Sequence, residues 1–586
     1  MKIYLNQSDK VRIRNSLLGI LGILVGAFVV YYIWFMKPME EVYVSPIPDL
    51  SLLENQRIKE NTELYRAEDR FKVYEMYVTV FNGPDAKTGE IFNLQSLNLI
   101  DGLEPDPQLD AFVQIKDPDT GHILLGNTGS EVNSTLSQRG QSARLAEQKS
   151  YKIKVFDNQG TFQGQQVLNL NKHTFDNSRA AQKFCMDQMA YFPDMVSLRT
   201  NFFRVYIKDG TQTNSAYVNY GLFTHVEQPN KTFLSDRGLD TNGSLYKPSD
   251  FEFFESPYIL PVNDPEFDED MFRLLLKIRE NPDNIKLARM LKDINDLNLD
   301  FSTVFQKYFD LDNYLTWCAM NILFNNYDTM SRNFLLYSPS YSEKWYFLPW
   351  DFDSCLLGEE RFNSRSLSEY FGIALYWGTP LHKRFFSNPD HVLLLNYRVD
   401  EIYQHLMSED WETLVPGYTN AILSGYKGSL DEMIKDTEPE DIVSEIADYQ
   451  NRITFYYNLY YTAQERPMPF FLGTPKQDGN EFQFNWSPSA DLQVDRMSYE
   501  FSIFTDYNQR QMSVVFQQET SLTKISVEQT LPDGQYYWSA IVRDAKGNWQ
   551  RSYDRYRIEN PDGTHYYQFG LKPFQIVQGL LVTKTD

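Results

Sequence analysis

Four polar residues between positions 328 and 353 have the types and spacing to bind a divalent cation. Asp328 and Asn333 lie in the stretch NNYDTMSRNFLLY, and Asp351 and Asp353 flank Phe352 directly after the apolar run WYFLPW. Carboxylate and amide oxygens are the ligands that Mg²⁺ prefers. A polar loop that leaves a helix and a strand that ends in carboxylates can place such groups around one ion. The spacing therefore indicates a metal site.

The order of these residues is also that of a phosphoryl-transfer site. Such sites use an Asp that accepts the proton of the attacking hydroxyl, an Asn five positions later and an Asp at a strand end that binds metal. Asp328, Asn333 and Asp351 repeat this order and interval. An Asp and an Asn in a loop can equally cap helices and form turns. Paired carboxylates also hydrolyse glycosides, so a metal-dependent hydrolase or polysaccharide-associated factor is an alternative, although the Asp-to-Asn interval has no particular role there.

The elements that precede these residues are predicted to be strands. From Phe71 onward, short apolar runs alternate with Gly, Asn and Asp, which is typical of an antiparallel sheet. Residues 203–226 predict a hairpin with a DG turn, and residues 178–190 predict a helix. The strand-like runs are FKVYEMYVTVF, AFVQIKD, SYKIKVF and QVLNL.

The elements around and after the polar residues are predicted to be mainly helical. Residues 264–282, 302–326 and 392–464 carry apolar side chains at helical spacing. Strands first and helices later indicate an α+β domain over residues 70–464, with an N-terminal β-rich lobe and a helical C-terminal lobe. Residues 467–560 alternate apolar and polar positions and contain Trp486, which predicts an all-β sandwich of the fibronectin type III or immunoglobulin-like class. Such a module serves as a spacer or adhesion unit or, alternatively, binds carbohydrate, and residues 561–586 are a C-terminal tail.

The N-terminal segment predicts a membrane anchor. Residues 16–36 hold no charged side chain, and this run is long enough for a helix that crosses the bilayer. Basic residues precede it. This predicts a single-pass membrane protein with a cytoplasmic N-terminus (1–15), a transmembrane helix (16–36), a stalk (37–69) and an extracytoplasmic body. A cleaved signal peptide is the alternative, but its apolar region would be shorter and would end in a small-residue cleavage site.

Composition excludes several classes of protein. The formal net charge of −24 over 586 residues argues against a nucleic-acid partner. The three Cys are widely spaced and form no CxxC, so neither a disulfide framework nor a zinc knuckle is expected. The motifs GxGxxG, GxSxG and HExxH and the P-loop pattern are absent.

Five sequence blocks in order resemble the CotH kinase family, the atypical kinases similar to spore coat protein H. They are RGQS (139–142) with QKSYKIKV (148–155), YGLFTHVEQPNKTFL (220–234), NGSLYKPSD (242–250), the Asp328–Asn333 interval and PWDFD (349–353). The resemblance covers roughly residues 70–460. The chain departs from the family pattern at Gln148, where a Lys is usual, and at Ser244, where an Asn is usual.

The resemblance implies a role for each matching residue. Asp328 would be the catalytic base, Asn333 and Asp351 would hold Mg²⁺ or Mn²⁺, and Asp353 would be a second metal ligand. A lysine of the 148–155 block or of the 242–250 block would contact the phosphates of ATP. Glu227 would pair with a Lys or bind metal. These lysines are Lys149, Lys152, Lys154 and Lys247. Arg139 would brace the loop that follows it or, alternatively, contact phosphate.

Two functions from different classes follow. The first is a membrane-anchored atypical protein kinase that transfers the γ-phosphate of ATP to Ser or Thr of a cell-surface or spore-coat protein. The second is a catalytically inactive surface binding or adhesion protein on the same scaffold, which the scarcity of ATP outside a membrane would favour. The sandwich adds cell-wall or surface polymers as candidate partners.

Overall fold

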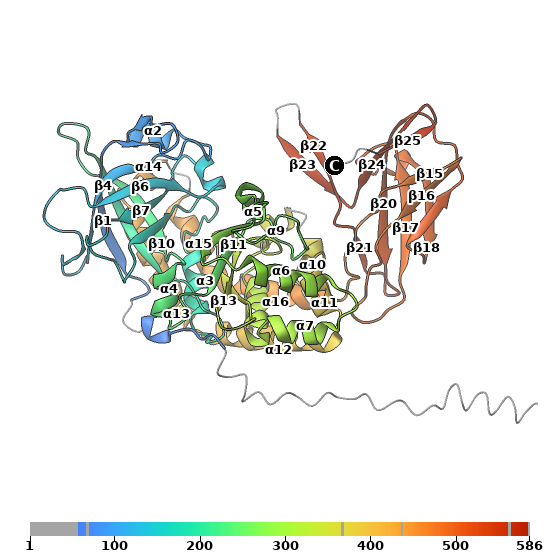
Figure 1. Ribbon diagram of the computed structural model, residues 1–586, viewed down its shortest axis with the longest axis horizontal. Helices are drawn as coiled ribbons and strands as arrows, with labels where there is room; N and C mark the ends of the chain where they lie inside the picture. Colours follow the sequence, from blue (N-terminus) through green and yellow to red (C-terminus); the bar gives the residue numbers. More distant parts are fainter. Residues whose placement is uncertain (1–56, 66–68, 365–367, 435–436, 561–563, 584–586) are drawn as a thin grey trace, which may run out of the picture. The chain divides into compact units, whose positions relative to one another are not determined.

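The computed structural model describes residues 57–65, 69–364, 368–434, 437–560 and 564–583. It is a mixed helix-and-sheet protein, as the sequence predicts. Figure 1 shows the strands of the first sheet in blue and teal and the later helices in green to orange.

The first sheet closes on itself. Its order is β1-β9-β10-β8-β7-β6-β4-β5, and β1 also pairs with β4. Alternate side chains point inward, so residues such as Val78, Val113, Ile153 and Phe203 fill a shared apolar core. The predicted strand runs and the β9–β10 hairpin are confirmed. The strands are β1 (Val73–Val80), β4 (Leu109–Lys116), β5 (Ile123–Leu125), β6 (Ser134–Arg139), β7 (Ser150–Val155), β8 (Val167–Asn171), β9 (Thr200–Asp209) and β10 (Val218–Val226).

A second sheet of four strands follows, in the order β12-β11-β13-β14. The prediction of one helix over residues 264–282 is wrong in its second half. The helix α5 (Glu269–Leu275) ends at Leu276, and the chain continues as a strand that pairs with β11. Leu276 and Ile278 alternate with Lys277 and Arg279, a period-two pattern that the preceding run of leucines hides. The strands are β11 (Ser244–Pro248), β12 (Leu276–Glu280), β13 (Phe334–Ser338) and β14 (Tyr346–Pro349).

The helices build the apolar core under the second sheet and also reach the first. In α8, every residue from Asn313 to Leu323 is buried. Figure 1 shows α13 and α14 (orange) beside strand β10 of the first sheet, and both pack on that strand. Asp431 of α14 is fully buried and pairs with Lys172 at 2.6 Å. The later helices are α6 (Asn284–Asn295), α7 (Phe301–Tyr308), α8 (Leu311–Leu323), α9 (Glu359–Ser364), α10 (Ile373–Tyr376), α11 (Pro380–Phe386), α12 (Pro389–Ser408), α13 (Trp411–Tyr426), α14 (Leu430–Ile434), α15 (Pro439–Ala447) and α16 (Tyr449–Gln464).

Shorter elements connect these layers. The strands β2 and β3 form a small pair of their own. The helix α3 follows β8 within the predicted helical range, and its residues are nearly all buried. These elements are η3 (Thr62–Tyr65), β2 (Gly83–Pro84), β3 (Ile91–Phe92), α2 (Leu94–Asn98), η4 (Ser142–Leu145), α3 (Ala181–Met189), α4 (Lys231–Asp236) and η5 (Ser368–Tyr370).

A buried ion network ties distant segments together. Arg237 pairs with Glu60 at 3.0 Å and with Glu227 at 2.9 Å, and all three side chains are 0% exposed. Arg199 also pairs with Glu227, at 2.7 Å, and with Asp236 at 2.9 Å. The network therefore joins the segment before β1 to the end of β10 and to α4.

The described part of the chain after α16 contains strands and one 3₁₀ turn. Its core holds Trp486 and Trp538 with Phe484, Phe501 and Phe574. The alternation predicted within residues 467–560 corresponds to strands, among them 481–485, 498–504 and 534–543, whereas the fibronectin or immunoglobulin subtype and the domain boundaries stay predictions. The elements are β15 (Lys476–Asp478), β16 (Glu481–Asn485), β17 (Ser498–Phe504), η6 (Gln511–Ser513), β18 (Val514–Thr520), β19 (Lys524–Val527), β20 (Gly534–Arg543), β21 (Trp549–Arg551), β22 (Arg555–Glu559), β23 (His565–Phe569), β24 (Lys572–Val577) and β25 (Leu580–Val582).

The predicted localisation has to be corrected. Within the described ranges, no helix combines the length and the apolar character that crossing a bilayer requires. The predicted transmembrane segment, residues 16–36, lies outside those ranges, as does most of the predicted stalk. The assignment to a single-pass membrane protein with an extracytoplasmic body is therefore withdrawn.

The buried network predicts a large stability effect. We expect Arg237→Met to lower the free energy of unfolding by about 3–5 kcal/mol, because Glu60 and Glu227 would lose their buried counter-charge. Urea denaturation followed by fluorescence measures this change. The matched control is Arg273→Met, whose pair with Glu269 is 59% and 60% exposed. We expect about 0–1 kcal/mol there, and equal effects of the two substitutions would contradict the assignment.

Candidate functional site

Strand register brings several of the predicted site residues to one end of the second sheet. Phe334 at the start of β13 pairs with Pro349 at the end of β14. Asn333 directly precedes that pair, and Asp351 follows it by two residues. On the next strand, Lys247 lies one residue before the end of β11, and β11 is antiparallel to β13. Amide, carboxylate and ammonium groups therefore gather where these three strands meet.

The loop that carries Asp328 is positioned by the end of α8. Asn325 adopts φ 51°, and the N–H groups of Asn325 and Asn326 donate to the carbonyls of Ile322 and Asn321. This is the Schellman arrangement that ends a helix with a left-handed residue. The Thr329 hydroxyl then donates to the Asn326 carbonyl at 2.9 Å. These bonds fix the loop two residues before Asp328 and one residue after it.

Asn333 and Asp351 share an uncommon backbone conformation. Their φ angles are 58° and 61°, in the left-handed region that Asn and Asp tolerate better than other side chains. Asn333 lies just before β13 and Asp351 lies just after β14. The positive φ takes the chain out of the strand geometry there, so these side chains do not follow the alternating directions of the strand residues. Residues held in this region cluster at functional sites.

Asp328 and Asp353 lie in environments that disfavour a negative charge. Partial burial raises the pKa of Asp328, and the charges of Asp351 and Asp250 raise it further, against the Arg332 guanidinium at 3.7 Å. Burial also raises the pKa of Asp353 well above its usual range, and Asp351 and Asp176 add to that effect. A divalent cation among these oxygens would offset the repulsion, so the donor set fits a hard metal ion.

Positive charges face the carboxylates. The Lys247 ammonium lies 4.6 Å from the centre of the Trp350 ring. Burial lowers the pKa of Lys247 to about 8, while Asp351 acts in the opposite direction. Burial likewise lowers the pKa of Arg139 to about 10, against the charges of Asp351 and Asp353. Arg139 therefore faces the acidic residues, and its two expected roles, bracing its loop and contacting phosphate, stay predictions.

Arg144 braces the RGQS loop. Its guanidinium donates to the carbonyls of Gly140 and Gln138 at 3.3 Å and pairs with Asp106 at 2.7 Å. The sequence did not predict this role for Arg144. Nothing in its spacing distinguishes it from Arg139, which belongs to the recognised block.

The three candidate lysines of the first sheet lie in different places. Lys149 is buried and pairs with Asp101 at 2.7 Å. Lys152 and Lys154 are exposed on β7, where Lys152 pairs with Ser137 of β6 and Lys154 with Thr135. Burial lowers the pKa of Lys152, Asp106 acts to raise it, and the nearby charges of Arg279 and then Arg139 lower it further. The structure thus brings Lys152 toward Arg139 and gives Lys149 a carboxylate partner of its own.

Glu227 lies in the buried ion network. Both of its oxygens are engaged, since Arg199 and Arg237 pair with it and the Arg199 N–H donates to it at 3.0 Å. The pKa of Glu227 is lowered: the two arginines outweigh burial, which acts to raise it. Its partners are arginines rather than the lysine or metal that the sequence reasoning considered.

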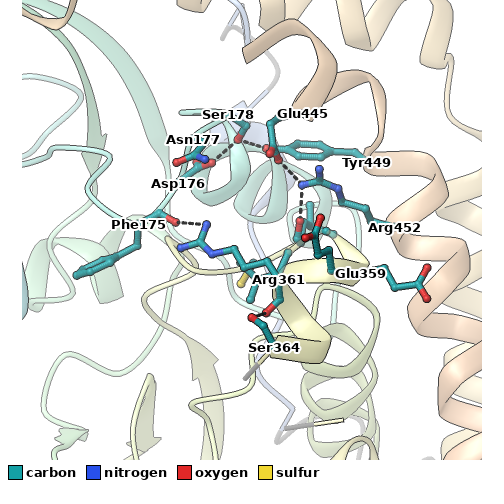
Figure 2. Close-up of a pocket in the computed structure, with 15 residues that line it drawn as sticks. Phe175, Asp176, Asn177, Ser178, Glu359, Arg361, Ser364, Glu445, Tyr449 and Arg452 are labelled. Atoms are coloured by element: carbon teal, nitrogen blue, oxygen red, sulfur yellow. Dashed lines mark hydrogen bonds and ion pairs between the residues drawn. The ribbon is translucent and has the colours of Figure 1, made fainter. Parts of the chain in front are cut away.

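A pocket of about 460 Å³ adjoins the loop after Asp353. Figure 2 shows Asp176 and Ser178 at the upper left of it, Tyr449 and Arg452 beside each other at the right, and Arg361 below. Asp176 is buried and accepts a hydrogen bond from the Ala181 N–H at 2.8 Å. Through Asp176 the pocket borders on the acidic group, because that carboxylate acts on Asp353. The sequence did not single out Asp176, because it is a lone Asp after a strand and belongs to no motif.

A separate acidic group lies after α16. Oxygens of Asp491, Asp495 and Asp544 approach within 4.8 Å of one another. The Lys546 ammonium lies 3.0 Å from Asp495 and supplies a counter-charge there. We assign this group no function.

The electrostatics of Lys247 can be measured. We expect competitive labelling with an amine-reactive reagent, read by peptide mass spectrometry, to give a titration midpoint near pH 8 for Lys247. Asp351→Asn should move that midpoint lower, because Asp351 stabilises the ammonium form. Asp110→Asn, at an exposed position of β4, is the control and should leave it unchanged. A midpoint near the ordinary value of about 10.4 would contradict the burial of this lysine.

Comparison with known proteins gives the family. The CotH kinase protein family model matches residues 136–456 of this 586-residue chain, more than half of it. The inner spore coat protein H of Bacillus subtilis (strain 168) is 24% identical over 263 residues, which cover 44% of this chain and 68% of that protein. The crystal structure of a Helicobacter pylori proinflammatory kinase, CtkA, is 13% identical and covers 53% of this chain and 94% of that one, with a TM-score of 0.19 that adds nothing to the fold assignment. The family match confirms the resemblance seen in the sequence blocks: the chain belongs to the CotH kinase protein family.

Proposed function

We propose that this chain is an atypical protein kinase that transfers the γ-phosphate of ATP to a Ser or Thr hydroxyl. The observation that carries the proposal is the convergence of Asn333, Asp351 and Lys247 at one end of the second sheet. Membership of the CotH family supports it.

Asp328 is the proposed catalytic base. It is held on a loop fixed at both sides, and its side chain is 52% exposed, so an acceptor hydroxyl can reach it. It would take the hydroxyl proton as the serine or threonine oxygen bonds to the γ-phosphorus and the bond to the departing ADP breaks. A raised pKa suits this role, because a base is most effective when its pKa lies near the working pH.

Asn333, Asp351 and Asp353 are the proposed ligands of Mg²⁺ or Mn²⁺. When bound, the ion would neutralise phosphate charge and hold the phosphates in line with the acceptor. Lys247 would contact phosphate oxygens from β11, and Lys152 and Arg139 would do so from the first sheet. Lys149 and Glu227 are assigned structural roles instead, because each has a counter-charge within the protein.

The proposed substrates are Ser- or Thr-containing proteins of a spore coat or cell surface. The name of the B. subtilis relative, an inner spore coat protein, supports the first of these settings. The scaffold alternative, a binding protein without activity, predicts that Asp328 is dispensable.

Phosphate transfer tests the proposal. The full-length chain is incubated with Mg²⁺ or Mn²⁺ and γ-labelled ATP, with itself and dephosphorylated casein as acceptors. We expect Asp328→Asn to lower the transfer rate by about 10²–10⁴-fold, the usual contribution of a positioned base. Asp351→Asn should raise the metal concentration needed for half-maximal rate.

The control is Asp110→Asn, which removes an exposed carboxylate of β4 and should leave the rate unchanged. Binding of ATP in the presence of Mg²⁺ is measured on the same preparations by titration calorimetry. If the wild-type chain neither binds ATP nor transfers label, the kinase assignment is wrong and the scaffold alternative holds.

A further inference from the structure

A β-bulge sets Arg279 apart from its neighbours on β12. Leu245 of β11 pairs with Glu280, and the next residue, Tyr246, pairs with Ile278. Arg279 is therefore the extra residue of the bulge and faces no partner in β11. Bulges often redirect a side chain and are frequent beside active sites. One register position further on, Lys277 lies directly opposite Lys247.

The cations at this end of the sheet make no direct ion pair with a carboxylate of the described residues. Among the described residues, Arg279, Lys277, Lys247, Arg139 and Lys152 form no ion pair and no side-chain hydrogen bond. The Nε of Arg279 is nonetheless buried. Such a group costs free energy unless something satisfies it. In a chain with a formal net charge of −24, a set of cations that forms no direct ion pair is unexpected.

The same cations repel one another across the two sheets. The charge of Arg279 acts on Arg139 at the end of β6, on Lys152 of β7 and on Lys247 of β11, and in each case it lowers the pKa. Burial alone lowers the pKa of Arg279 itself. Like charges held together in a partly desolvated place favour the binding of an anion.

We propose that Arg279 is a phosphate-binding residue and that, with Lys247 and Arg139, it forms a polyphosphate site between the two sheets. The proposal deepens the kinase function and rests on it for the identity of the nucleotide. The geometry carries it: a bulge residue with a buried, unpartnered nitrogen lies among cations from both sheets. A guanidinium suits this task because its planar fork of N–H donors matches two phosphate oxygens at once.

The ligand class follows from the charges. Several cations near one another match a chain of phosphates rather than a single one, so the site should prefer triphosphate over diphosphate and diphosphate over monophosphate. Because none of these contacts involves the nucleobase or the ribose, inorganic tripolyphosphate should bind as well. Adenosine should contribute separately, through other residues.

Calorimetric titration of the full-length chain with MgATP and with inorganic tripolyphosphate tests the inference. We expect Arg279→Gln to weaken binding of both ligands about tenfold or more, as loss of a charged hydrogen bond does. Arg279→Lys should recover part of the loss. The matched control is Arg289→Gln, since Arg289 is an exposed arginine paired with Glu343, and it should bind both ligands as the wild type does.

A second measurement uses the wild-type chain, so it does not depend on the folding of a variant. Phenylglyoxal modifies arginines, and we expect tripolyphosphate to protect Arg279 while Arg289 remains reactive. Unchanged affinity in Arg279→Gln, or no protection of Arg279 by a bound ligand, would overturn the inference even if the wild type transfers phosphate. The opposite pattern, Arg279-dependent binding without any transfer, would uphold this inference and overturn the kinase assignment alone.

Discussion

Hydrogen bonds between β13 and β14 set Phe334 opposite Pro349, and this register places Asn333 and Asp351 at the same end of the sheet. A shift by one residue would turn each strand's alternate side chains to the other face. Apolar burial holds the register, because every residue of both strands is buried. The position of the proposed metal ligands is therefore a consequence of core packing.

Charge is distributed unevenly around that sheet end. Asp351 and Asp176 add negative charge beside Asp353, and Arg279 and Arg139 add positive charge beside Lys247. The attraction between the two sets offsets only part of the effect of burial on the pKa values, since the pKa of Lys247 remains lowered and that of Asp353 remains raised. A metal ion beside the carboxylates and phosphates beside the cations would lower the electrostatic free energy of both sets together. The arrangement suits a ligand that carries both charges, such as a nucleotide with its metal.

Sequence patterns predicted the acidic part of this site better than the basic part. Asp328, Asn333, Asp351 and Asp353 stand close in sequence, and local turns and one strand pair suffice to relate them. Arg279 escaped notice because the run of leucines before it has helical spacing, whereas pairing with β11 makes the segment a strand. Tertiary pairing overrides local propensity in such short runs. Much of the fold, including the hairpin, the later helices and the C-terminal strands, follows from periodicity alone.

The contrast between Glu227 and Asp353 separates charges that serve the fold from charges that serve a ligand. Both carboxylates stand in recognised family blocks, and burial acts to raise the pKa of each, so the sequence could not distinguish them. Arg199 and Arg237 are the counter-charges of Glu227, and together they outweigh the effect of burial on its pKa. Arg237 in turn depends on Glu60, which lies before the region that the family model matches. Among the described residues, Asp353 and Arg279 form no ion pair, and Arg139 offsets only part of the effect of burial on the pKa of Asp353. A cation bound beside Asp353 and an anion bound beside Arg279 would therefore stabilise both charges.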